Sequence, residues 1–358
     1  MKIIDLTAPQ RELRVRIDPS PAYDFLACLF LLERYEDSLG FEVSKAWVER
    51  ARGALGGELR ADLSVFFPAR GRTLGIVGVL DHHPGLSIRG FIKRVVSTPP
   101  EELLELMLAE ALADRQSLPL LRSAIGGSAQ PIEAFLAAIH SEVDAEALRR
   151  LLGLYPSEAK ARLVRLLREG YTRVYMRQEA EVAPLLERDV AVLTRRAASS
   201  APGALVEHAT GGFVIDPDVP LAGIVLAPTF YFRPYNLITA YHGIRVFVYP
   251  IESSPGQQAP PPELVRLYKA LGDETRLRIL RLLAGREMYL QELANALGVS
   301  HVTVLHHMAI LRAAHVVQVV ERENLKYYRL RAGRAREAAT QWLEFVRAQD
   351  ARAQGGRA

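Results

Sequence analysis

A short segment near the C-terminus constrains the fold more than any other part of this sequence. Residues 288–314 read MYLQELANALGVSHVTVLHHMAILRAA, two stretches of helical periodicity separated by the turn Gly-Val-Ser at 298–300. Ala294 is a small residue where two such helices would approach most closely; Gly298 follows it by four positions and apolar Val304 by ten. Two helices that cross at a short turn require residues of these types at this spacing. The segment therefore predicts a helix-turn-helix.

The second helix of this pair has two different faces. Ser300 is suited to cap its N-terminus. The apolar stripe that predicts its buried side consists of Val304, Met308 and Leu311. His301, His306 and His307 lack the i,i+3 or i,i+4 spacing with which two imidazoles on a helix hold one metal ion. We interpret the polar face as a DNA-contacting surface, because a recognition helix presents its exposed face and N-terminus to the major groove.

Two β-prone runs follow this pair of helices. They span residues 316–321 and 326–330 and are separated by a short segment with basic residues near its tip. Two further helices are expected before this pair. The first is an amphipathic helix over 263–271, and the second is capped by Asp273 and ends at Gly285. A helix-turn-helix followed by a two-stranded hairpin is a winged helix, which is the domain that this part of the sequence predicts.

The positive charge of the chain is concentrated in the same region. The 358 residues carry a formal net charge of +4. Residues 262–358 hold 16 Lys and Arg against 10 Asp and Glu, a net +6, which leaves 29 against 31, or −2, for residues 1–261. A polyanion would therefore dock on the C-terminal part.

Four short motifs lie within residues 268–330. They are KALGDETRLRILRLL, Glu-Leu-Ala…Leu-Gly-Val-Ser at the turn, Thr-Val-x-His-His-x-x-x-Leu-Arg in the second helix, and Tyr-Tyr-x-Leu in the last strand. Together they resemble the DNA-binding domain of ArsR-type transcriptional regulators. The resemblance implies a winged-helix homodimer that binds an inverted-repeat operator in double-stranded DNA, most often as a repressor released by a signal. It implies a regulator and no enzyme.

Two departures from this family concern the signal. Metal-sensing members carry a Glu-Leu-Cys-Val-Cys-Asp-Leu box before the turn, and here Tyr289 and Gln291 stand at the two cysteine positions. The other common metal site uses acids and histidines of the last helix, where residues 334–347 hold no His and only Glu337 and Glu344 as acids. We expect no metal at either site and no cofactor, which leaves an unknown small molecule as the open alternative for an effector.

The candidate site residues follow from these two lines of reasoning. DNA contacts are expected from Ser300, His301, Thr303, His306, His307, Arg312, Arg322 and Lys326. A buried, hydrogen-bonded packing role is an equal alternative for His307. The broad apolar surface of the last helix predicts dimerisation through Trp342, Leu343, Phe345 and Val346. Further basic side chains that could neutralise a phosphate, or lie on a solvated face, are Arg276, Arg278, Arg281 and Arg329.

The part of the chain before residue 252 changes from helical to strand-like patterns. Helices are expected at 22–35, 44–59, 100–115, 131–139, 145–152, 157–169 and 174–198. Strands are expected at 204–207, 212–215, 223–227, 231–233 and 244–250. The predicted fold class is α+β: a mainly helical N-terminal region with a small antiparallel sheet, plus the winged helix.

The domain boundaries are predicted from composition. Residues 253–262 read SSPGQQAPPP, an uncharged linker between a domain at 1–252 and the winged helix at 263–358. Sensing, dimerisation and scaffolding are all open roles for residues 1–252. This region is weakly similar to larger ArsR-like regulators, with Ala227-Pro228-Thr229-Phe230 and Val248-Tyr249-Pro250 as the matching strands.

An enzymatic alternative rests on GIVGVLDHHPG at residues 75–85. Its Asp81, His82 and His83 follow a strand-like run and resemble the metal-binding motif of DHH phosphoesterases. The preceding Asp-x-Asp motif of those enzymes has no counterpart in residues 1–80, so we favour a loop with solvated or capping side chains. Arg233, among aromatic residues, could face an anionic ligand, but sheet packing is the favoured interpretation.

Two further sequence features indicate where in the cell the protein is expected. The longest apolar run, at 25–32, is too short to cross a bilayer, and the N-terminus lacks the apolar segment of a signal peptide. We expect a cytoplasmic protein without a membrane partner. Cys28, the only cysteine, is expected to be a small core residue.

Overall fold

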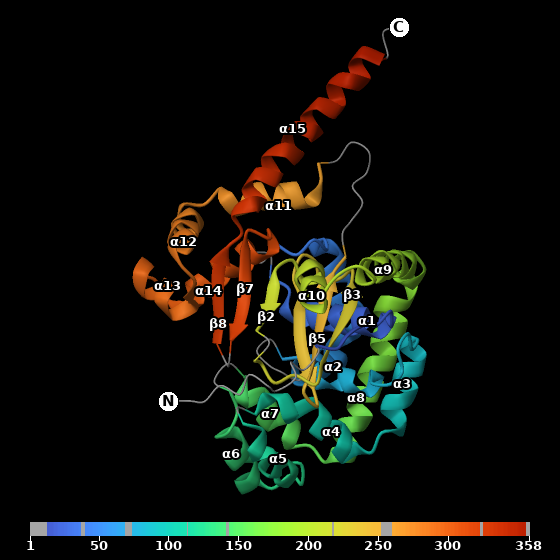
Figure 1. Cartoon of the computed structure of the whole chain (residues 1–358). Coiled ribbons are helices and arrows are strands. Elements are labelled where there is room, and N and C mark those ends of the chain that lie inside the picture. The colour runs from blue at the N-terminus through green and yellow to red at the C-terminus, as the bar shows by residue number, and fades with distance from the viewer. Residues whose placement is uncertain are drawn as a thin grey trace. The chain divides into compact units, whose positions relative to one another are not determined.

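The computed structural model describes residues 13–36, 40–68, 74–112, 114–140, 143–216, 218–251, 260–322 and 325–355. The chain divides into two compact units (Figure 1). The N-terminal unit comprises the described parts of 14–199 and 221–251, and the C-terminal unit comprises the described parts of 1–13, 200–220 and 252–358. Most of the predicted linker at 253–262 lies outside the described residues.

The N-terminal unit is mainly helical. Its helices are α1 Pro21–Arg34, α2 Lys45–Phe66, α3 Ile88–Ser97, α4 Pro100–Leu108, α5 Leu118–Ala124, α6 Ala129–Leu136, α7 Ala145–Leu152, α8 Pro156–Gly170 and α9 Met176–Ala197. A π-helical turn, Tyr171–Tyr175, joins α8 to α9. Each helix expected from the sequence is present, whereas α3 and α5 were not predicted.

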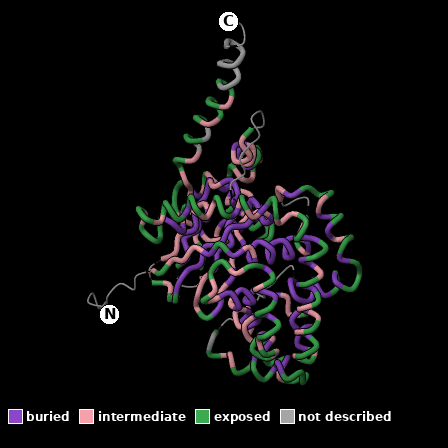
Figure 2. Tube along the Cα trace, turned by 90° about the vertical axis from the view of Figure 1, so that its right-hand side faces the viewer, coloured by how far each residue is buried: buried purple, intermediate pink, exposed green. Residues whose placement is uncertain are grey.

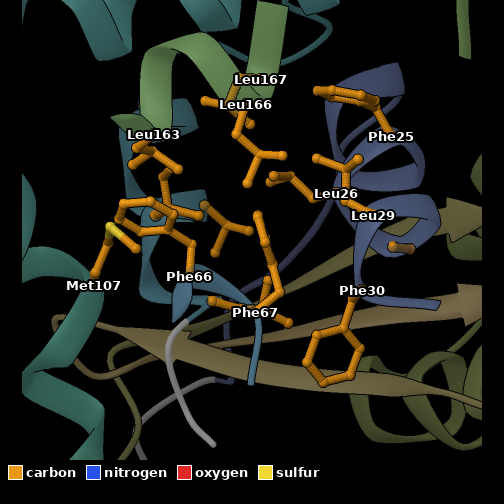
Figure 3. Packing of buried hydrophobic residues seen from close by; sticks show 14 of the residues in the cluster. Phe25, Leu26, Leu29, Phe30, Phe66, Phe67, Met107, Leu163, Leu166 and Leu167 are labelled. Carbon is orange, nitrogen blue, oxygen red and sulfur yellow. The ribbon is translucent and has the colours of Figure 1, made fainter. Parts of the chain in front are cut away.

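Apolar side chains from several of these helices form one core. Figure 3 shows Phe25, Leu26, Leu29 and Phe30 of α1 packed toward residues of α2, α4 and α8, all buried. Helix α1 is buried from Ala22 to Leu32 because α2, α3 and the sheet cover it on different sides. Cys28 is fully buried in this helix, so its expected core position is confirmed.

The sheet of the N-terminal unit is mixed. Its strands are β1 Val15–Ile17, β3 Gly223–Thr229, β4 Leu237–Tyr241 and β5 Ile244–Pro250, in the order β1-β3-β5-β4. β1 and β5 both pair with β3 in parallel, and β4 pairs with β5 antiparallel. The α+β class is confirmed, but the expectation of an antiparallel sheet is wrong. The helices between β1 and β3 return the chain in the same direction, and β4 does so between β3 and β5.

Two predicted strands are not strands. Residues 204–207 belong to α10 Pro202–Thr210, which begins with proline and ends at left-handed Gly211. Residues 231–233 form a turn, held by backbone and side-chain hydrogen bonds to the buried carboxylate of Asp24.

Asp24 joins α1 to the end of β3. Its Oδ1 accepts hydrogen bonds from the Thr229 hydroxyl at 2.7 Å and from the Phe230 and Tyr231 amides at 2.7 and 3.2 Å. Its Oδ2 accepts a hydrogen bond from the Tyr175 hydroxyl at 2.7 Å. Burial raises the pKa of this carboxyl, while the four donors oppose that rise.

The C-terminal unit contains the predicted winged helix. Its helices are α11 Pro262–Leu271, α12 Glu274–Gly285, α13 Leu290–Leu297, α14 His301–Ala313 and α15 Ala332–Gly355. The wing hairpin is β7 Val317–Arg322 with β8 Leu325–Leu330, and β6 Met288–Tyr289 pairs with β8. The two predicted hairpin strands are thus confirmed. The wing tip at 323–324 lies outside the described residues.

A segment assigned to the N-terminal domain from the sequence belongs to this unit instead. Residues 200–220 carry α10 and the strand β2 Phe213–Ile215, and β2 pairs in parallel with β7. The sheet order is therefore β2-β7-β8-β6. The proposed single boundary near residue 252 needs this correction, because a strand's partner is set by tertiary contacts that local patterns do not contain.

Exposure differs strongly along the chain. Figure 2 shows the described part of α15 as mostly exposed, in contrast to the purple helices of the core. Among the described residues, no helix is both long and apolar enough to span a bilayer.

Candidate nucleic-acid interface

The turn between α13 and α14 has the geometry that its sequence predicts. Gly298 adopts a left-handed conformation with φ +68° and donates its amide hydrogen bond to the Ala294 carbonyl. Ala294 and Val304 are 2% and 0% exposed, so both are buried as the predicted contact between α13 and α14 requires. The helix-turn-helix inferred from the three-point spacing is present.

The N-terminus of α14 is fixed by a side-chain cap. The Ser300 Oγ accepts a hydrogen bond from the Thr303 amide at 3.1 Å, and the two hydroxyl oxygens lie 2.8 Å apart. This cap leaves the first turn of the helix ordered and open to solvent, with Ser300, His301 and Thr303 all exposed. These residues have the accessibility that contact with a base or phosphate requires.

Two exposed apolar residues on α14 were missed by the sequence reasoning. Val302 is 65% exposed and Leu305 is 47% exposed, although both are apolar. Both lie off the buried stripe of Val304, Met308 and Leu311, and that offset is the signal that could have found them. Apolar side chains at such positions can contact thymine methyl groups in the major groove.

The histidines of α14 have different environments. His306 is partly exposed, whereas the side chain of His307 is 14% exposed and its Nδ1 lies 3.8 Å from Asp273 Oδ1. Burial lowers the pKa of His307. The ring of His307 faces the N-cap of α12, as the packing alternative expects, but its Nδ1 has no hydrogen-bond partner among the described residues. Contact of His307 with DNA stays a prediction.

The basic residues divide into structural and accessible groups. The Nε of Arg276 donates to the Ala270 carbonyl at 2.7 Å and its Nη2 to the Lys269 carbonyl at 2.9 Å, so this arginine closes the C-terminus of α11. Arg312, at the end of α14, is partly exposed, and Arg322 and Lys326 are exposed at the wing. The latter three have the accessibility expected of phosphate ligands.

The wing arginines already have acidic neighbours. Arg322 Nη1 lies 2.6 Å from Glu287 Oε2, and Arg322 Nε lies 3.6 Å from Asp216 Oδ2. Arg329 Nη1 lies 3.6 Å from the other oxygen of Glu287. DNA phosphates would thus compete with carboxylates for these guanidinium groups.

The last helix exposes the apolar side chains predicted for dimerisation. Trp342, Leu343 and Val346 are 47%, 42% and 46% exposed, and Phe345 is partly exposed. Exposed large apolar side chains gathered on one helix are typical of a contact surface.

The two positions of the family's cysteine box hold residues with other contacts. The Tyr289 ring lies edge-on to that of Tyr327, with 6.1 Å between centroids. Gln291 donates a hydrogen bond to Asn295 at 2.9 Å. Neither side chain is a thiolate, so the metal chemistry of that box is not available here.

The Asp81 motif does not have the geometry of the phosphoesterase site. Asp81 follows a 3-10 helix, Leu74–Leu80, where a strand was expected. Its Oδ1 accepts hydrogen bonds from the Tyr241 hydroxyl at 3.1 Å and from Arg16 at 3.5 Å. Among the described residues, no group of three His, Cys, Asp or Glu side chains could hold a metal ion. Asp81 is therefore a packing residue that joins this turn to the sheet.

Arg233 is also occupied within the N-terminal unit. Its side chain is 9% exposed, its Nε lies 3.6 Å from Glu42, and its guanidinium lies 4.1 Å from the centre of the Phe230 ring. These contacts are packing contacts, but they are made from the turn at 231–233 and not from the sheet strand that was expected.

Together these elements define a winged-helix domain with an exposed recognition helix. The family model described as bacterial regulatory protein, arsR family, matches residues 273–319. The transcriptional repressor SdpR of Bacillus subtilis (strain 168) is 30% identical over 80 residues, which are 22% of this chain and 89% of SdpR. The HTH-type transcriptional regulator KmtR of Mycobacterium tuberculosis (strain ATCC 25618 / H37Rv) is 37% identical over 67 residues, 19% of this chain and 52% of KmtR.

The chain belongs to the arsR family of bacterial regulatory proteins. Its C-terminal unit carries the DNA-binding module of a transcriptional regulator. None of these matches extends over more than 22% of the chain, so they do not characterise the N-terminal unit.

Proposed function

We propose that this protein is a sequence-specific repressor that binds an inverted-repeat operator as a homodimer. The observation that carries the proposal is the exposed face of α14, where His301, Val302 and Thr303 stand open to solvent at a capped helix N-terminus. A helix presented in this way fits the major groove. The repressor role is supported by the similarity to SdpR, which is named a transcriptional repressor.

Different residues are proposed to serve affinity and specificity. His301, Thr303 and His306 are assigned to base edges, with Val302 and Leu305 as apolar contacts. Ser300 positions the helix as its cap. Arg312, Arg322 and Lys326 are assigned to phosphates, which position the protein without reading sequence.

The homodimer is proposed to form through α15. Trp342, Leu343 and Val346 expose large apolar surfaces that a second copy would cover, and Phe345 adds to the same surface. Two-fold symmetry of such a contact would place two recognition helices on two half-sites of an inverted repeat.

The signal is proposed to be different from the metals of the family's usual sites. Tyr289 of β6 and Gln291 of α13 stand at the two thiolate positions, and residues 334–347 of α15 hold only Glu337 and Glu344 as acidic side chains. The N-terminal unit is proposed as the sensor of an unidentified small molecule, with a purely structural or dimerising role as the alternative outcome of ligand screening.

Gel-shift titration with DNA from upstream of the protein's own gene tests the main proposal. We expect the full chain to bind a fragment of that DNA at least about tenfold more tightly than a random duplex of equal length. Equal affinity for both duplexes would overturn sequence-specific recognition. A reporter fused to the bound promoter should be more active when the regulator is deleted; lower activity would indicate an activator.

Analytical ultracentrifugation tests the dimer separately. We expect the wild-type chain to sediment as a dimer and the double variant Trp342→Ala, Val346→Ala to shift toward monomer. Glu344→Ala, on the same helix, is the matched control, since it removes no large apolar surface. A wild-type monomer at tens of micromolar would overturn this part of the proposal.

A further inference from the structure

The segment of residues 200–220, here called the docking segment, extends the sheet of the winged helix. Its strand β2 pairs with β7 in parallel, with Phe213, Val214 and Ile215 opposite Val319, Val320 and Glu321. The Val319 amide donates to the Gly212 carbonyl and the Asp216 amide donates to the Glu321 carbonyl, both at 3.0 Å. The edge of the wing sheet that β7 would otherwise present is therefore covered by a strand of the same chain.

Side chains on both sides fix the position of this segment. Gln318 of β7 donates a hydrogen bond to Glu207 of α10 and accepts one from Arg329 of β8. The Nη1 of Arg331 donates to the Gly211 carbonyl at 3.1 Å. The docking segment thus contacts β7 and Arg331, the residue directly before α15.

The closest approach occurs at Gly211. Its φ is +70°, and a Cβ added there would lie 2.5 Å from the Nε2 of His315. His315 itself has φ +58° at the end of α14. A side chain at 211 would therefore be strained by its backbone conformation and would collide with the imidazole.

The docking segment ends at the wing arginines. Asp216, directly after β2, places Oδ2 at 3.6 Å from Arg322 Nε, and the side chains are 29% and 44% exposed. Asp216 also accepts a hydrogen bond at Oδ1 from the Asp218 amide at 3.0 Å. The carboxylate of Asp216 is therefore held beside the guanidinium that DNA is expected to contact.

We propose that the docking segment restrains the wing: while β2 is paired with β7, Asp216 competes with DNA phosphate for Arg322. The inference rests on the proposed DNA-binding function. The segment follows α9 at one end and leads into β3 at the other, so it is covalently continuous with the N-terminal unit on both sides. A conformational change that pulls on either connection would act on β2. Release of β2 would remove the Asp216 carboxylate and leave Glu287 as the acidic neighbour that still competes with phosphate for Arg322.

Fluorescence anisotropy of a labelled duplex with the full chain tests the competition. Asp216→Asn keeps the shape of the side chain and the oxygen that accepts from the Asp218 amide, but it removes the competing charge. We expect its affinity at low salt to rise about two- to fivefold, the range of a partly exposed ion pair. If one phosphate contact is gained, the slope of log affinity against log salt should steepen by about 0.9.

Two variants control for the change in net charge. Asp218→Asn makes the same change two residues away at an exposed side chain, and its affinity should rise less than that of Asp216→Asn. In an Arg322→Ala background the gain from Asp216→Asn should disappear. An unchanged or weaker affinity for Asp216→Asn, a gain equal to that of Asp218→Asn, or a gain retained without Arg322 would each overturn the proposal.

Hydrogen exchange tests the docking itself. Gly211→Ala should displace the segment, so that the Val319 amide exchanges faster and DNA affinity rises. Gly298→Ala is the matched control, because its φ of +68° is similar but nothing lies within 4 Å of the added Cβ, and it should speed exchange at Val319 less than Gly211→Ala does. Unchanged Val319 exchange in Gly211→Ala, or faster exchange without a gain in affinity, would contradict the restraint.

The two hypotheses fail differently. If neither the wild type nor any variant binds duplex DNA, the proposed function fails. If the wild type binds and Asp216→Asn behaves as Asp218→Asn does, only the restraint fails.

Discussion

The two units of this protein use their polar side chains in opposite ways. In the N-terminal unit Asp24, Asp81 and Arg233 are engaged with partners inside the unit, in contacts that hold helices and strands together. On α14, by contrast, His301 and Thr303 stand in solvent. A polar group that is buried and fully bonded stabilises the fold, whereas an exposed one on a rigid helix is available to a ligand. This contrast explains why residues suited to a binding function can be identified in the C-terminal unit and not in the N-terminal unit.

The largest expected effect is the loss of stability when a buried, hydrogen-bonded polar side chain is removed. Asp24→Ala should lower the free energy of unfolding of the N-terminal unit by about 3 to 5 kcal/mol, because it leaves buried hydroxyl and amide donors without an acceptor. Urea denaturation measures the loss. Glu101→Ala, at an exposed acid of α4, is the control. A loss below about 1 kcal/mol would mean that water or rearrangement satisfies those donors.

Substitutions at the exposed polar residues of α14 should change DNA recognition and leave the stability unchanged. His301→Ala or Thr303→Ala should reduce discrimination between the operator and a duplex altered in one half-site by about 1 to 3 kcal/mol. Arg322→Ala should weaken binding to both duplexes alike. Competition gel shifts measure the difference. His307→Ala is the contrasting variant: it should leave base discrimination intact, and a loss equal to that of His301→Ala would place His307 at the DNA after all.

His315 differs from the exposed histidines of the C-terminal unit, because its imidazole is shielded from solvent. Burial, together with the nearby charges of Arg266, Arg334 and Arg331 and the neighbouring His208, lowers the pKa of His315 to about 3. In the unfolded chain the pKa of this imidazole is about 6.5, so between about pH 3 and 6.5 the unfolded state binds more protons than the folded state. Stability from this group is therefore complete above about pH 6.5 and is lost as the pH falls toward 3, by at most about 1.4 kcal/mol per pH unit.

The matched variant for this pH effect is His315→Asn, because asparagine tolerates the left-handed backbone. We expect the stability of the variant to fall less steeply than that of the wild type between pH 6.5 and 4.5, as measured by hydrogen exchange of the β7 amides. His301→Asn, at an exposed position, is the control. Parallel pH profiles for wild type and His315→Asn would show that this imidazole stays accessible to protons.

The smallest expected effect concerns the turn that presents α14. Gly298→Ala should cost about 1 kcal/mol of stability, because its φ of +68° is unfavourable for a residue with a Cβ but no atom lies in the way. Thermal unfolding measures it. A cost well above 2 kcal/mol would mean that the added methyl group meets an obstacle.

The sequence predicted the winged helix well because its local signals agree with its tertiary fold. Asp273, Gly298 and Ser300 each serve as the cap or turn residue expected from their type and position. The residues 145–152 were predicted as a helix with the same limits as α7, whose apolar residues follow the helical period. Agreement of capping, periodicity and turn chemistry is what makes such a prediction secure.

Other features could not be predicted from local patterns. The four residues 204–207 were expected to form a strand, but Pro202 and Gly211 delimit a helix around them. The strand at 212–215 was recognised, whereas its partner β7 lies about a hundred residues away and is chosen by tertiary packing. The exposure of Val302 and the burial of His307 likewise depend on how α12 packs against α14, which the period of one helix does not specify.

The buried position of Cys28 makes this thiol a chemical probe for opening of the N-terminal unit. This single thiol lies at 0% exposure on α1, and burial raises its pKa well above the ordinary value. A thiol reagent can modify it only in molecules whose core has opened, so its labelling rate measures opening of the N-terminal unit in the intact regulator. Ligands that bind this unit should slow the labelling, which provides a screen for the effector that requires neither an operator nor a promoter.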